Sequence, residues 1–137
     1  MSLRSIPLLV IAFILYNVIV FAFGTEALAS LAFPEIHMLS GGVWRFTWGD
    51  FIILITLFLL FAELIKATYT NTSSLVDHGL SMIVFILCIV EFLLAPQAAT
   101  STFFLVMVAT AIDVVAGFTI GIRVARRDLS IGGAGGD

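Results

Sequence analysis

The chain has 137 residues, of which 61% are hydrophobic and 11% charged, and its net charge is −3. Soluble domains are about 45–50% apolar and about 25% charged, and a chain of this size could not hide so much apolar surface from water. The composition therefore excludes an ordinary soluble domain and indicates that membrane lipids surround the chain. The small negative charge and the lack of a basic patch also argue against a nucleic-acid partner.

Four apolar runs follow one another, each close to the length of about 20 residues that a membrane helix needs. They cover residues 6–23, 51–67, 79–95 and 102–122. The runs are apolar nearly all round, so their length identifies them rather than their periodicity. None shows the polar alternation of a membrane β-barrel strand. The sequence predicts a single transmembrane domain over residues 1–137, an all-α four-helix bundle with up-down-up-down order.

The first run has a second interpretation. Residues 27–29 read Ala-Leu-Ala, which resembles a signal-peptidase site, so a cleaved leader is the alternative. The run 6–23 has 18 residues, whereas the apolar core of a leader has about 7–15. The length favours a retained membrane helix.

The segment 25–48 between the first two runs is long for a connection and is not polar. Thr25 could cap a short helix that ends before Pro34. We expect one or two helices lying in the headgroup layer. Trp44 and Trp48 are then interfacial anchors that share a helix face. The alternative is that the segment caps a cavity or forms a docking surface.

The basic residues predict the orientation. Five of the six share one side if the chain crosses four times, and they are Arg4, Lys66, Arg123, Arg126 and Arg127. Only Arg45 falls on the other side. Because Lys and Arg near span ends prefer the cytoplasm, both termini are expected there. Arg126 and Arg127 are expected to anchor the topology on anionic lipid, and the glycine-rich residues 129–137 to form a flexible tail.

Three polar residues lie deep within the runs. Counted from the cytoplasmic ends of their spans, Asn17 lies at roughly 16 Å, Glu91 at roughly 18 Å and Asp113 at roughly 14 Å. These depths predict one polar cluster near the middle of the membrane. Such residues usually face protein or a water-filled cavity. The cluster could be a proton or cation relay, or a set of interhelical hydrogen bonds that hold the bundle together.

Small residues flank Asp113 at helical spacing. Ala109, Gly117 and Gly121 share its helix face, and the two glycines form a pair that lets another backbone approach closely. We therefore expect this face to pack against protein. Glu63 and Lys66 are three residues apart near the cytoplasmic boundary and are expected to form a local ion pair.

Motifs for catalysis or cofactor binding are missing from the sequence. It contains no CxxC, HExxH, GxSxG or phosphate-binding glycine loop, and an outer metal site of Glu35, His37 and Asp50 is a weak alternative. We expect no metal, no cofactor and no enzyme activity, a lipid-modifying enzyme included. The sequence favours an accessory or scaffolding subunit of a larger membrane complex, bound to other membrane protein subunits or to itself. The alternative is an oligomeric ion or proton channel or transporter that uses the midplane cluster.

Overall fold

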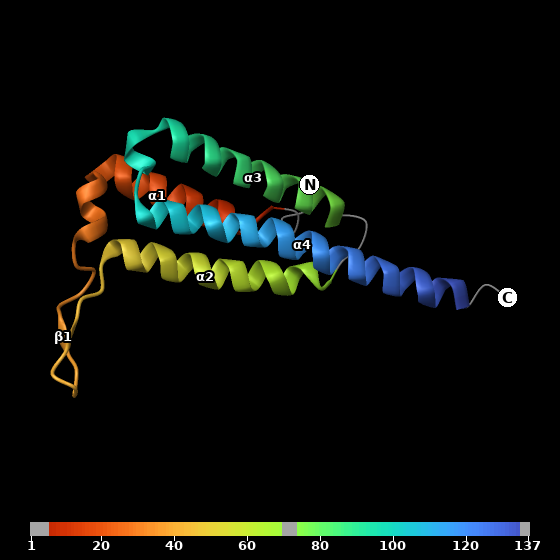
Figure 1. The fold of residues 1–137 in the computed structure, drawn as a ribbon, viewed down its shortest axis with the longest axis horizontal. Helices are drawn as coiled ribbons and strands as arrows, with labels where there is room; N and C mark the ends of the chain where they lie inside the picture. The colour runs from red at the N-terminus through yellow and green to blue at the C-terminus, as the bar shows by residue number, and fades with distance from the viewer. Residues whose placement is uncertain (1–5, 70–73, 135–137) are drawn as a thin grey trace.

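The computed structural model describes residues 6–69 and 74–134, and four α-helices dominate them. They are α1 (Leu9–Phe23), α2 (Trp48–Ala67), α3 (Ser74–Leu94) and α4 (Ser101–Ala134). Figure 1 shows the four helices side by side, with consecutive helices running in opposite directions. The prediction of an all-α, four-helix fold is confirmed. The end of the bundle where α1 finishes and α2 starts is called the hairpin end, because a β-hairpin connects the two helices there. The opposite end is called the tail end.

Three helices are long and apolar enough to cross a membrane. They are α2, the part of α3 from Val76 to Leu94, and the part of α4 from Ser101 to Arg123. α1 is equally apolar but has only 15 residues, or about 22 Å of helix. These lengths support a small multi-pass membrane protein.

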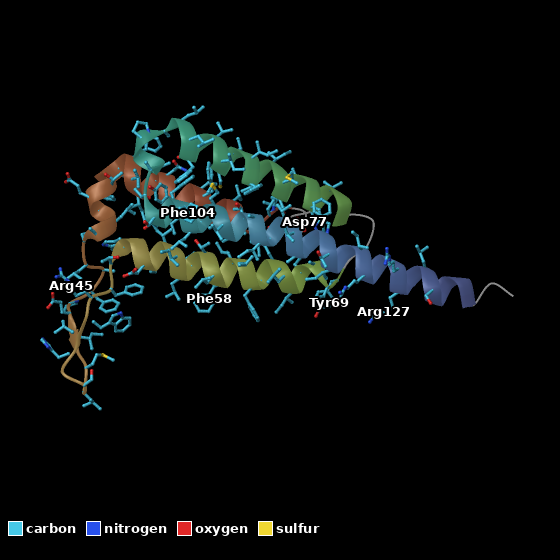
Figure 2. The ribbon with its side chains drawn as sticks, viewed as in Figure 1. Arg45, Phe58, Tyr69, Asp77, Phe104 and Arg127 are labelled. Carbon is cyan, nitrogen blue, oxygen red and sulfur yellow. The ribbon has the colours of Figure 1, made fainter. Side chains whose placement is uncertain are left out.

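The core lies around α4, which contacts each of the other three helices. Tyr16 of α1 is fully buried there, with its ring edge-on to Phe103 at 4.9 Å between centroids. Its hydroxyl donates to the Gln97 carbonyl at 2.7 Å and lies 2.7 Å from Thr100 Oγ1. Large apolar side chains such as Phe58, labelled in Figure 2, point outward instead. A bundle with a small core and an apolar exterior is suited to lipid.

The segment 25–48 differs from its prediction. Before α2 begins at Trp48, only η2 (Thr25–Ala29), a short 3-10 helix, is helical. The chain then forms an antiparallel hairpin of β1 (Ile36–His37) and β2 (Val43–Trp44). The helical interfacial segment is thus corrected to a hairpin. The reason is local, because Gly41 has φ +88°, a conformation that suits a tight turn and not a helix.

The hairpin also separates the two tryptophans. Trp44 lies on β2, while Trp48 is the first residue of α2, so they share no helix face. α2 begins there because Thr47 and Asp50 form a reciprocal capping box. The Thr47 side chain accepts from the Asp50 N–H at 3.2 Å, and the Asp50 carboxylate accepts from the Thr47 N–H at 3.1 Å.

Two helix boundaries at the tail end also differ from the prediction. α3 begins at Ser74, before the predicted start at residue 79. α4 continues to Ala134, past the predicted end at residue 122. Residues 129–134 of the predicted flexible tail are therefore helical, and residues 135–137 lie outside the described residues.

Candidate functional site

Charged and polar side chains of three helices meet near the tail end, and we call them the charged cluster. Its members are Glu63 and Lys66 of α2, Asp77, His78 and Ser81 of α3, and Asp113 of α4. Glu63, His78, Ser81 and Asp113 are buried. Ionisable residues in such surroundings need partners, because an isolated charge is costly away from water.

Lys66 supplies those partners within the cluster. Its ammonium donates to Glu63 Oε1 at 2.9 Å and to Asp77 Oδ1 at 3.4 Å, and to the Ile6 carbonyl at 3.0 Å. An ammonium has three N–H donors, so all three are used. The predicted Glu63–Lys66 ion pair is confirmed. Lys66 also forms an ion pair with Asp77 of α3.

Glu63 also ties α2 to the start of α1. Its Oε1 accepts the backbone N–H of Leu8, one of the N–H groups that a helix start leaves without an internal partner. Only 3% of Glu63 is exposed. The carboxylate thus acts as a cap for α1 from a neighbouring helix.

Asp113 has different neighbours. Ser81 of α3 and the charged groups of Glu63, Asp77 and Lys66 are its electrostatic neighbours. Three carboxyl groups therefore surround one ammonium that Glu63 and Asp77 already engage. Among the described residues, Asp113 is the carboxyl group of the cluster that has no ion pair.

His78 fills a notch in α4. Its ring lies 4.9 Å from that of Phe118 and faces Gly117 and Gly121, both of which are buried. A Cβ at Gly117 would lie 3.0 Å from His78 Nδ1, and one at Gly121 would lie 2.8 Å from Nε2. Among the described residues, Nε2 has no hydrogen-bond partner. The face of α4 that also carries the buried Ala109 is thus in contact with α3 of the same chain at its two glycines.

A second polar group lies nearer the hairpin end. The Asn17 amide donates to Glu91 Oε2 at 3.2 Å and to the Phe13 carbonyl at 2.9 Å. The pair lines a groove of about 560 Å³ between α1 and α3. Both side chains are half-buried.

The structure brings Asn17 and Glu91 together but places Asp113 in the charged cluster. Asn17 is six residues before the end of α1, and Asp113 is twelve residues after the start of α4. At about 1.5 Å per residue, they lie at about 9 Å and about 18 Å from the hairpin end. The depths predicted from the sequence were counted from the cytoplasmic ends of the apolar runs. At that end of the bundle, the tail end, α3 and α4 extend beyond the runs by different lengths. The single midplane cluster thus becomes two polar groups at different depths.

Sequence reasoning missed three members of the charged cluster. Asp77 and His78 fall between the predicted runs 51–67 and 79–95, and Ser81 lies inside the latter as one polar residue among apolar ones. A usable signal was present, because Asp77 and His78 lie four and three residues before Ser81, the spacing that places side chains on one face of a helix that starts before residue 79. The polar composition of residues 68–78 hid the start of α3.

The predicted anchors lie at both ends. Arg126 and Arg127 are exposed on the part of α4 that extends past the other helices, as the label on Arg127 in Figure 2 shows. Trp44 and Trp48 are exposed at the hairpin end, at 46% and 39%. Both locations are compatible with contact to headgroups.

Within residues 6–69 and 74–134, no group of three His, Cys, Asp or Glu residues is placed to hold a metal ion. Comparison of the chain with protein-family models, with curated proteins and with solved structures finds no match.

Proposed function

We propose that this multi-pass membrane protein is a non-enzymatic accessory or scaffolding subunit of a larger membrane complex. The observation that carries the proposal is the hairpin, which projects sideways from the bundle (Figure 1). Its tip residue Leu39 is fully exposed, and Met38, Val43 and Trp44 are each nearly half exposed. Exposed apolar surface of this kind marks protein–protein or membrane interaction sites.

The hairpin has a fixed shape. Phe33 stacks on Phe46 at 5.1 Å, and Trp44 meets both rings edge-on at 5.7 and 5.8 Å. An ion pair of Arg45 with Glu35 at 3.3 Å links the two arms. A projection that is already ordered loses little conformational freedom when it binds, which favours association.

The charged cluster is consistent with a structural role. Lys66 engages both Glu63 and Asp77, and Glu63 also holds the start of α1. Internal pairing of this kind joins three helices and leaves the apolar exterior for lipid and partners.

The test is the size of the native particle. A tagged full-length chain is extracted from its own membranes in mild detergent and run on a native gel beside the purified chain. We expect a particle well above the 14.8 kDa monomer, with other subunits in fixed ratio. Leu39→Asn should weaken the assembly, whereas Ser40→Asn, at the neighbouring exposed position, should not. A native extract that holds only the single chain contradicts the proposal.

The proposed orientation has both termini in the cytoplasm. Lys66, Arg123, Arg126 and Arg127 lie at the tail end, whereas Arg45 lies in the hairpin, and the positive-inside tendency then puts the tail end in the cytoplasm. In a Cys88→Ser background, a membrane-impermeant maleimide should label Ser40→Cys in intact cells. Ser130→Cys should react only after lysis. The reverse pattern contradicts the orientation.

A second candidate is an oligomeric proton or cation transporter, and one observation favours it. Asp113 is 5% exposed, and the one ammonium near it already donates to Glu63, Asp77 and the Ile6 carbonyl. Membrane-embedded acids often belong to proton or ion pathways. Reconstituted liposomes with an internal pH dye test it. Transport should be abolished by Asp113→Asn and kept by Asp50→Asn, since Asp50 is exposed at the start of α2. Absence of flux under both pH and voltage gradients rules this candidate out.

A further inference from the structure

The groove between α1 and α3 opens on the outside of the bundle. On one side it is lined by Ile14, Asn17, Val18 and Phe21 of α1, and on the other by Glu91 of α3 and Gln97 beyond its end. Ile14, Val18 and Phe21 are 53%, 58% and 69% exposed. Their spacing of four and three residues forms one apolar seam along α1, the pattern that docks another helix.

A carboxylate lies in this seam. Among the described residues, the Asn17 amide is the one hydrogen-bond donor to the Glu91 carboxylate, and its nitrogen also donates to the Phe13 carbonyl, so both of its N–H groups are used. Counted along their own helices, Asn17 lies about 9 Å before the end of α1 and Glu91 about 4.5 Å before the end of α3. Glu91 is half-buried, so part of it faces the open groove. A carboxyl group in contact with hydrocarbon is costly unless a donor or a cation meets it.

We infer that the groove holds a transmembrane helix of a different membrane protein, which presents a Lys or Arg side chain to Glu91. The inference rests on the proposed accessory role and names its interface. The occupant is a helix because a segment within the bilayer must satisfy its own backbone hydrogen bonds. A basic side chain complements the carboxylate and completes its hydrogen bonding.

A second copy of this chain fits less well. Among the described residues its cations lie at other levels, with Arg45 in the hairpin and Lys66 at the tail end. A copy docked symmetrically, groove to groove, would bring another Glu91 close to the first, and like charges repel. The missing positive charge therefore comes from another protein.

The test is photo-crosslinking in native membranes. A photoreactive amino acid replaces Val18 in the groove or, as the matched control, Leu57 on α2, which is 56% exposed and outside the groove. We expect an adduct to one defined protein from position 18 and not from position 57. Mass spectrometry of the crosslinked peptide should place the adduct on a membrane span that contains Lys or Arg.

The charge is tested in the same membranes. Glu91→Gln should reduce the position-18 adduct by about tenfold, as expected for the loss of about 1.4 kcal/mol. Glu26→Gln should leave the adduct unchanged, since Glu26 is exposed on η2. Equal thermal unfolding of the two variants separates a lost contact from a lost fold.

Four adduct patterns would overturn the inference. They are an adduct of twice the chain mass, adducts to lipid alone, a partner span without a basic residue, and an adduct that persists in Glu91→Gln. If the native complex is intact while position 18 gives none of the expected adduct, the groove is not the interface and the accessory role stands. If the native extract holds only the single chain, both fail.

Discussion

The contact of His78 with α4 gives the sharpest stability prediction, through the variant Gly121→Ala. The added Cβ would lie 2.8 Å from His78 Nε2, closer than unbonded atoms tolerate. His78 is 8% exposed and its ring lies against Phe118, so the side chain cannot move aside without losing contacts. Overpacking of this kind costs about 1–3 kcal/mol, whereas Ala in place of a helical Gly gains about 0.5–1 kcal/mol.

The control is Gly79→Ala on α3, where an added Cβ meets nothing within 4 Å. It carries the same helix gain without the clash and should raise the free energy of unfolding by about 0.5–1 kcal/mol. Gly121→Ala should fall below this control by about 1–3 kcal/mol, the overpacking cost. Unfolding is followed by circular dichroism in micelles of rising SDS content.

A double variant identifies the clashing partner. In a His78→Ala background the ring is gone, so Gly121→Ala should change stability as Gly79→Ala does. The reasoning is refuted if Gly121→Ala and Gly79→Ala shift the unfolding midpoint equally in the wild-type background, or if His78→Ala leaves their difference intact.

Three further variants test other contacts by the same unfolding assay. Tyr16→Phe removes the hydroxyl that meets the Gln97 carbonyl and Thr100, and it should cost about 1–3 kcal/mol; an unchanged midpoint would contradict the buried hydrogen bonds. Lys66→Met leaves Glu63 buried without its cation and should cost about 3–5 kcal/mol, with part restored by adding Glu63→Gln; no recovery in the double variant would argue against the pairing. Thr47→Ala removes the capping box of α2 and should cost about 0.5–2 kcal/mol, whereas a stability equal to wild type would show that the cap contributes nothing.

The four helices could be predicted because the signal for each is long. About 20 apolar residues in a row have few alternatives in a small protein, and α2 as well as the apolar parts of α3 and α4 follow from that length alone. The Glu63–Lys66 pair was equally accessible, since both residues lie on one helix and their spacing fixes their distance.

Contacts between helices could not be predicted in the same way, because they depend on where each helix ends. Asp113 was grouped with Asn17 and Glu91 since the ends of the apolar runs were taken as level. α3 starts earlier and α4 continues further than those runs, which moves Asp113 towards Ser81. The hairpin was missed for a related reason, as its apolar residues resemble those of an interfacial helix and only the turn at Gly41 distinguishes them.

The shortness of α1 has a consequence for the surrounding bilayer. Lipid beside α3 meets an apolar wall of 19 residues, whereas lipid beside α1 meets a helix of 15, a difference of about 6 Å. Hydrophobic mismatch of this size is relieved by thinning or by helix tilt, at fractions of a kcal/mol per Å. In a bilayer, the two sides of the bundle would therefore match different hydrocarbon thicknesses.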